Sequence, residues 1–199
     1  MKKTIYLLSM IIISALLSGC AHPIKINPEL NKLPPSSSPT KINAHIAYYI
    51  PPELSSLEVT TPGGGGDNIR YYPYKDIEAG YAQILNNTFT NVHKLQTENA
   101  VTSTSNNIDY IIQPTIITNS SSTGFFTWPP TNFTVDLTSN IRRLLDNKMT
   151  NVRAVGIGYV VNDTDRLLDH GIAGRKAMED ALLKTQNYLL NLDFFLEKK

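Results

Sequence analysis

The chain has 199 residues with 18 basic and 17 acidic side chains, a net charge of +1, and one cysteine. This near-neutral balance provides no electrostatic footprint for nucleic acid and excludes a nucleic-acid partner. The length suffices for a single domain with its own core.

The first twenty residues form a leader. Two lysines precede an apolar run from Thr4 to Leu17, which is flanked like an export signal and is short for a membrane-spanning helix. The run ends in Leu17-Ser18-Gly19-Cys20, which resembles the lipobox of bacterial lipoproteins. The resemblance implies that residues 1–19 are a signal peptide and that Cys20 takes a diacylglycerol and palmitate. The alternative is an ordinary cleaved signal peptide with an incidental cysteine.

Removal of this leader leaves 16 basic and 17 acidic residues, and therefore a charge of −1. Two or more acyl chains hold a protein stably on a membrane, so a lipidated Cys20 suffices as the anchor. With Cys20 lipidated, no thiol remains for a disulfide, a metal site or a nucleophile. No other apolar run approaches twenty residues, so we expect no other membrane span.

Residues 20–41 combine the lipidated Cys20 with a segment rich in proline and serine. This composition predicts a tether that holds the domain away from the lipid surface. Ala21 follows the cysteine, and lipoproteins with this residue resemble those sorted to the outer membrane. We therefore expect a lipid-anchored outer-membrane protein that faces the periplasm.

The first half of the domain is predicted to contain one strand and one helix. Residues 42–50 alternate Ile42 and Ile46 with polar positions, which predicts a strand. Residues 54–70 are typical of a loop, and the glycines at 63–66 lack the Lys-Ser/Thr pair of a nucleotide-binding loop. Apolar residues at intervals of three and four predict a helix from Asp76 to Val92.

The second half is predicted to contain three strands and a closing helix. The strands are expected at 108–118, 133–145 and 152–161, with Pro114 at an edge or a bulge of the first. The helix is expected from Ile172 or Arg175 to the end. The order β-α-β-β-β-α predicts an α+β domain over 42–199, with an antiparallel sheet of about four strands and two helices on one face.

A search for reactive groups predicts no enzyme. The four histidines are isolated and have no zinc-binding spacing. Asp163, Asp165 and Asp169 partly match a calcium loop, but Leu168 replaces its glycine and Gly174 replaces its glutamate, so a turn before a helix is the better interpretation. We expect no catalytic residue, no metal and no cofactor.

An aromatic connector is the candidate contact site. Phe125, Phe126 and Trp128 lie where polar turn residues would be ordinary. Two interpretations remain open: the rings cap the core, or they form an exposed tip that contacts a partner or a membrane interface. Tyr72 and Tyr74 are expected to line the same surface.

The lipobox, the tether and the element order together resemble small α+β lipoproteins of Gram-negative envelopes. These include lipoproteins of lipopolysaccharide assembly, of lipid-transport ABC systems, of curli secretion and of penicillin-binding-protein activation. The resemblance implies a non-enzymatic accessory or assembly subunit of an envelope complex, acting through protein–protein contacts. The alternatives are a periplasmic module that binds a small molecule or lipid between helix 76–92 and the sheet under an aromatic lid, and an envelope hydrolase using Asp136, Asp163 or Asp165.

Overall fold

The computed structural model describes residues 21–35, 40–97, 108–123 and 128–195. Its strands are β1 (Ala21–Pro23), β2 (Ile42–Tyr49), β3 (Val59–Gly64), β4 (Asp67–Tyr71), β5 (Phe89–Leu95), β6 (Tyr110–Ser121), β7 (Asn132–Arg143) and β8 (Met149–Tyr159). Its helices are α2 (Pro52–Ser55), α3 (Pro73–Thr88), α4 (Asp163–Leu168) and α5 (Ile172–Leu190), with 3₁₀ turns η1 (Leu30–Lys32) and η3 (Asp193–Phe195). None of these helices is both long enough and apolar enough to span a membrane.

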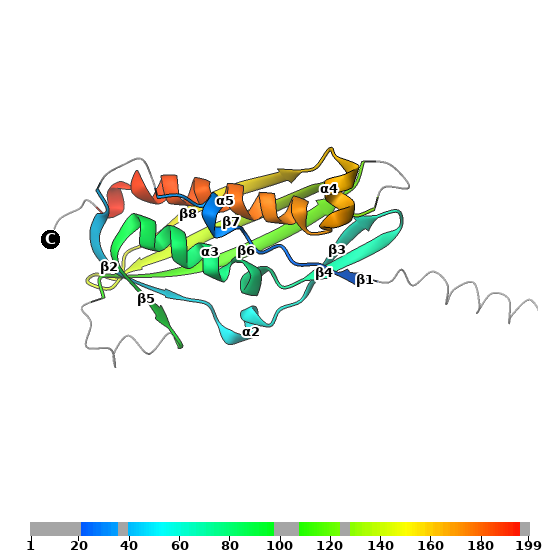
Figure 1. Cartoon of the computed structure of the whole chain (residues 1–199). Helices are drawn as coiled ribbons and strands as arrows, with labels where there is room; N and C mark the ends of the chain where they lie inside the picture. The colour runs from blue at the N-terminus through cyan, green and yellow to red at the C-terminus, as the bar shows by residue number, and fades with distance from the viewer. Residues whose placement is uncertain (1–20, 36–39, 98–107, 124–127, 196–199) are drawn as a thin grey trace, which may run out of the picture.

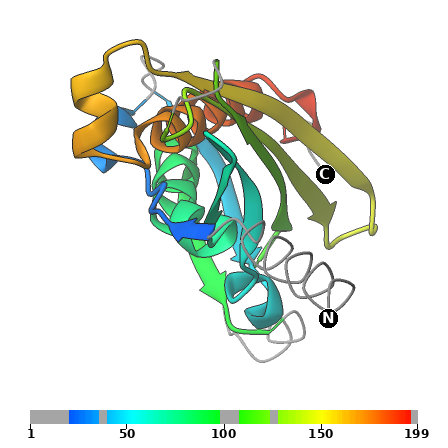
Figure 2. The ribbon, with the colours of Figure 1, turned by 90° about the vertical axis from the view of Figure 1, so that its right-hand side faces the viewer.

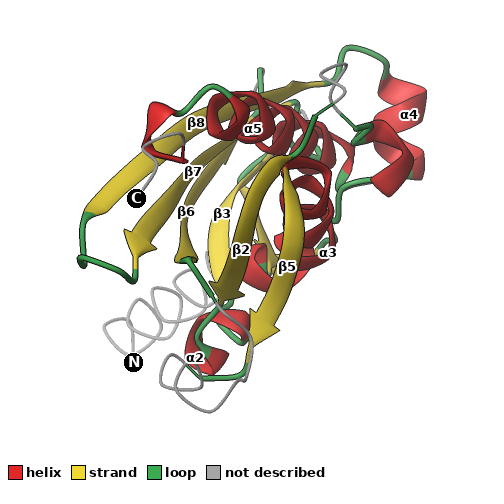
Figure 3. Ribbon diagram, turned by 90° about the vertical axis from the view of Figure 1, so that its left-hand side faces the viewer, coloured by secondary structure: helices red, strands yellow, loops and turns green. Residues whose placement is uncertain are grey.

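The main sheet has five strands in the order β5-β2-β6-β7-β8, and α3 and α5 cover one of its faces (Figures 1 and 3). Strands β6, β7 and β8 form an antiparallel meander, whereas β2 runs parallel to both β5 and β6. The α+β class is therefore confirmed. The expected four-stranded antiparallel sheet is wrong, because the sheet is mixed and contains the unpredicted strand β5.

Helix α3 begins and ends earlier than predicted. Pro73 occupies the first turn, where a proline costs no helical hydrogen bond, and the helix ends at Thr88. Ile77, Tyr81 and Ile84 are fully buried against the sheet, and Tyr81 Oη lies 2.7 Å from Ser139 Oγ of β7. The chain then enters β5 at Phe89, so the predicted last helical turn is a parallel edge strand.

The segment predicted as a loop folds into a hairpin. Strands β3 and β4 pair antiparallel around Gly65 and Gly66, which have φ angles of 64° and 91° that glycine adopts readily. Strand β1 adds to β4, giving a second sheet in the order β1-β4-β3. Hydroxyl contacts join the hairpin to β6, because Thr61 Oγ1 lies 2.6 Å from Ser120 Oγ and Tyr71 Oη lies 2.7 Å from Thr118 Oγ1.

Residues 21–35 are part of the domain, which corrects the prediction that residues 20–41 form a tether. Ile24, Ile26 and Leu33 are buried in the core, and burial of such a side chain stabilises a fold by about 1.5–3 kcal/mol. The backbone is also bonded, since Ile26 N–H donates to Asp76 Oδ2 at 3.2 Å. Proline-rich composition suits an extended chain, and here that extended chain packs against α3 and α5.

Helix α5 lies unusually close to β8. A Cβ added at Gly156 would come within 2.1 Å of the Ala177 oxygen, and one at Gly158 within 1.8 Å of the Ala173 oxygen. The helix presents only small side chains here, including the buried Ala177 and Ala181. The inward positions of β8 must therefore be very small.

Candidate functional site: the anchor end and the open sheet face

Trp128 is half-buried against the domain rather than free of it. Its ring centroid lies 4.6 Å from that of His22 and 5.7 Å from that of His170. It also covers Gly63 of β3, where an added Cβ would lie 2.4 Å from Trp128 Cζ3. Trp128 is joined to the buried Pro129 by a cis peptide bond. Phe125 and Phe126, the other rings of the predicted contact site, lie outside the described residues, as does Cys20.

The structure does not bring the two tyrosines to Trp128. Tyr74 is only 4% exposed, and its hydroxyl accepts a hydrogen bond from Ile116 N–H at 3.1 Å, so it belongs to the core. Tyr72 is 38% exposed, but it follows β4 at the end opposite to Gly63, about 15 Å away by strand rise. Its hydroxyl donates to Glu58 at 2.6 Å, which raises the pKa of Tyr72.

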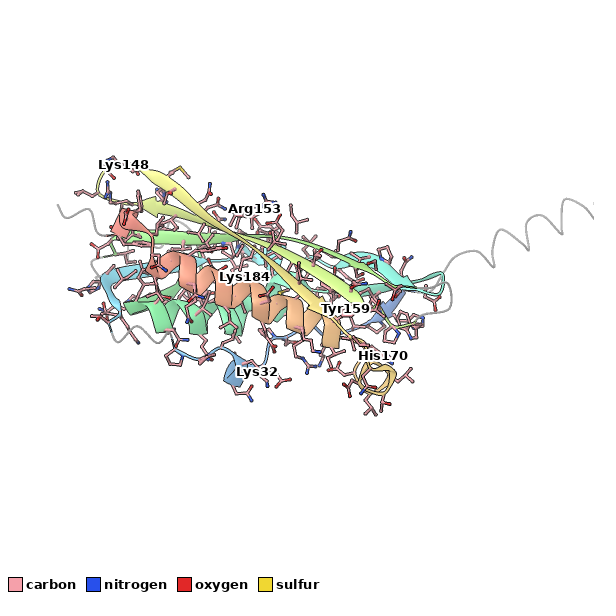
Figure 4. The ribbon with its side chains drawn as sticks, turned by 90° about the horizontal axis from the view of Figure 1, so that it is seen from above. Lys32, Lys148, Arg153, Tyr159, His170 and Lys184 are labelled. Carbon is pink, nitrogen blue, oxygen red and sulfur yellow. The ribbon has the colours of Figure 1, made fainter. Side chains whose placement is uncertain are left out.

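The end of the molecule that carries β1 also carries α4; we call it the anchor end, defined by His22, Trp128, α4 and His170. Figure 2 looks onto this end, and Figure 4 shows His170 there and Lys148 at the opposite end. Asn162 begins α4 by accepting a hydrogen bond from Thr164 N–H. This short helix was not predicted, since residues 162–165 were expected to form a loop. Asp169 is ion-paired with Arg175.

Apolar side chains on α4 and just before it are unusually exposed. Leu168 is 82% exposed, Val161 79% and Leu167 60%. Their exposure could not be predicted from the sequence, because a short apolar run is ordinary in a helix whose packing is not known. They give the anchor end an exposed apolar surface.

The second exposed apolar surface lies on the main sheet, on the face opposite α3 and α5; we call it the open face. Ile117 and Val155 flank Asp136 across three strands, and Ile157 and Tyr159 continue the row along β8. Ile117 is 67% exposed and Ile157 61%. In the same stretch of β8 the inward positions are Ala154, Gly156 and Gly158, so its large apolar side chains all lie on the open face.

An ion pair lies within the open face. The guanidinium of Arg153 donates to both carboxylate oxygens of Asp136, with the shortest distance 2.6 Å. These hydrogen bonds lower the pKa of Asp136, so this carboxylate is charged and paired rather than poised for proton transfer. Figure 4 shows Arg153 on the sheet and Lys184 on the helix layer.

The outer edge of β8 is occupied by side chains of α5. Ile157 N–H donates to Asp180 Oδ2 at 2.9 Å, and Lys184 Nζ donates to the Val155 oxygen at 2.9 Å. Capped edge groups of this kind prevent another strand from adding to a sheet. A partner would therefore meet the face of β8 rather than its edge.

The space between α3 and the sheet, where the alternative hypothesis places a ligand, is filled by the buried side chains of α3. In the described part of the chain, no three histidine, cysteine, aspartate or glutamate side chains are grouped so as to hold a metal ion.

No family model matches the chain, and no curated protein does. Similar solved structures include a DUF330-family protein from Xanthomonas campestris, with 11% identity and a TM-score of 0.46 over 87% of this chain and 92% of that chain. The PelC dodecamer from Paraburkholderia phytofirmans gives 12% identity and 0.42 over 76% and 94%. A Caulobacter crescentus protein named as a lipoprotein gives 11% and 0.34 over 73% and 96%. At these values the likeness says nothing about function, which has to come from the residues themselves.

Proposed function

We propose that this chain is a non-enzymatic lipoprotein of the outer membrane that faces the periplasm and serves as an accessory or assembly subunit of an envelope complex. The lipobox-like Leu17-Ser18-Gly19-Cys20 supports the anchor. In this proposal the open face of β6, β7 and β8 binds the partner protein.

The observation that carries the proposal is the pattern of side-chain size along the end of β8, where small residues face the core and large apolar residues face solvent. Over its last six residues the buried positions are small (Ala154, Gly156, Gly158), and the exposed positions are large and apolar (Val155, Ile157, Tyr159). Ile117 on β6 adds a further exposed apolar side chain to this face and is separated from Val155 by Asp136 of β7. Contiguous exposed apolar residues with a polar surround are typical of protein-contact surfaces.

The experiment that tests this function is site-specific photocrosslinking in growing cells. A photoreactive amino acid replaces Ile157 on the open face or, as a control, Tyr188 on α5, which is 50% exposed. We expect one discrete protein adduct from position 157 and none from position 188. The adduct should disappear when Ile117→Asp is added, because the charge would lie inside the same contact.

Equal adducts from both positions, or no discrete adduct from position 157, would contradict the proposal. Circular dichroism of the Ile117→Asp protein provides the folding control. This side chain is 67% exposed, so we expect its substitution to leave the fold intact.

A further inference from the structure

The lipidation site lies directly beside the folded domain in the sequence. Ala21 pairs with Asn68 in the sheet β1-β4-β3, so residue 21 is already part of the folded domain. One peptide bond, about 3.8 Å between Cα atoms, separates Ala21 from Cys20. If Cys20 is lipidated, as the proposed function requires, the anchor end lies at the membrane surface without a spacer.

Contacts between side-chain rings connect α4 with the segment that follows the lipidation site. The ring of His22, two residues after Cys20, contacts Trp128, and Trp128 contacts His170. His170 follows Leu168 by two residues. The ring contacts His22–Trp128 and Trp128–His170 therefore connect the segment after Cys20 with the helix that carries the exposed leucines. Figure 1 shows β1 and α4 at the same end of the molecule.

The surface of α4 at the anchor end has the apolar side chains expected of a lipid contact. Leu167, Leu168 and Val161 expose most of their apolar side chains, and the half-buried Trp128 belongs to the same end of the molecule. Tryptophan favours the boundary between lipid headgroups and hydrocarbon, and an apolar helical surface enters this layer by about 5–10 Å. At the same end His22 Nε2 lies 3.3 Å from Asp67 Oδ2, and Arg175 is ion-paired with Asp169.

We propose that Leu167, Leu168 and Val161 insert into the lipid surface beside the acylated Cys20 and thereby form a second membrane contact; this inference rests on the proposed function. A lipid on Cys20 alone permits rotation about one attachment point, whereas the second contact fixes the orientation of the domain. Strands β6, β7 and β8 then project from the membrane, over about 40 Å for the twelve residues of β6. The open face is thereby held toward partners in the periplasm.

The test compares two exposed leucines at opposite ends of the molecule. Leu168→Cys places a thiol on α4, and Leu145→Cys places one beside the β7–β8 turn, where the leucine is 67% exposed. Each full-length lipidated protein is labelled with an environment-sensitive maleimide dye. It is then reconstituted into vesicles of phosphatidylethanolamine and phosphatidylglycerol (about 3:1 by design) with or without brominated acyl chains.

We expect the dye at position 168 to shift to shorter wavelength and to lose at least about half of its emission to the brominated lipid, because insertion brings it into quenching range. The dye at position 145 should show neither change. Equal behaviour at both positions overturns the inference. A thiol at position 168 that is shielded from the maleimide dye in cells but reacts with it in vesicles would indicate that a protein covers α4. This result would also overturn the inference.

A second measurement needs no labelled variant. Trp128 is the only tryptophan, so its quenching by brominated lipid reports the same end of the unmodified protein. We expect this quenching to fall at least about twofold in Leu167→Ser/Leu168→Ser and to stay unchanged in Leu145→Ser. Unchanged quenching in the α4 variant contradicts the inference. Failure of the proposed function gives a different result. The wild-type protein itself would then react with the maleimide dye, because Cys20 would carry a free thiol.

Discussion

At the scale of single residues, Asp76 connects the N-terminal segment to α3. Its side chain is 7% exposed and accepts the Ile26 N–H hydrogen bond at 3.2 Å. Burial raises the pKa of Asp76, and the Ile26 hydrogen bond only partly opposes this effect. The fold therefore favours the neutral carboxyl group, while an acceptor is needed at this position at every pH.

This leads to a prediction for stability against pH. Because the folded-state pKa of Asp76 is raised, its contribution is fully present below the unfolded value of about 3.9 and is lost as pH rises through the folded value. Asp76→Asn keeps an acceptor oxygen but cannot ionise. We expect the free energy of unfolding of Asp76→Asn, relative to wild type, to increase from about pH 4 upward.

Urea denaturation at several pH values measures this difference. As a control, Asp76→Ala leaves Ile26 N–H without its acceptor and should be less stable than Asp76→Asn by about 1–3 kcal/mol at all pH values, because neither variant ionises at this position. A difference between Asp76→Asn and wild type that stays flat with pH would refute the assignment.

Pro114 shows how far a single residue can be interpreted from sequence. It was predicted at an edge or bulge, and β2 pairs with β6 only through Tyr110, Ile111 and Ile112. Ile116 N–H points away from β7 to Tyr74 Oη, and nitrogens two residues apart point the same way, so the Pro114 nitrogen faces this unpaired edge. β6 is an interior strand, but Pro114 lies beyond the end of its pairing with β2, so the proline removes no ladder bond there.

At the scale of elements, the contact between α5 and β8 shapes both the core and the open face. The glycines of β8 allow the helix backbone to approach, and the large residues of the same strand consequently lie outside. The free energy of folding and the exposed apolar row thus both depend on the short distance between α5 and β8.

We expect Gly158→Ala to lower the free energy of unfolding by about 3 kcal/mol, the upper end for overpacking a core. Its Cβ would meet the oxygen of Ala173 and the nitrogen of Ala177, which are backbone atoms that move only if α5 moves. Ile157→Ala, on the exposed side of the same strand, should cost less than about 1 kcal/mol. Urea denaturation compares the two variants, and equal costs would show that α5 does not restrict β8.

The elements with strong periodicity were predictable, and those without it were not. Alternating apolar residues identified β2 and the β6–β8 meander within a few residues. Strand β5 was missed because only Phe89 and Leu95 are buried in it, and β3 because its Pro-Gly composition is typical of a loop. Burial of Ile24 and Ile26 depends on α3 and α5 being in place, so composition alone indicated a tether.

The candidate site was only partly predictable for the same reason. The sequence marked Trp128, but its partners His22 and His170 are distant in the chain and meet only in the fold. The alternation of Gly156 and Gly158 with Val155 and Ile157 was visible, yet it identifies the outward face only when the position of α5 is known.

At the scale of the whole molecule, two exposed apolar surfaces have different positions relative to the lipidation site. The anchor end adjoins residue 21, and the open face extends away from it along β8 (Figure 4). In our account the first contacts lipid and the second contacts protein. Both assignments depend on Cys20 being a lipid-modified residue.

The most direct test of the account is therefore fractionation of cells that express the full chain with Cys20→Ala, with labelled palmitate in the medium. We expect the wild type in the outer-membrane fraction with palmitate attached, and the variant without palmitate and absent from that fraction. Ser18→Ala keeps a small residue in the lipobox-like motif and should behave as wild type. Palmitate on the Cys20→Ala protein, or a wild type that is unlabelled and found in the soluble periplasmic fraction, would contradict the account.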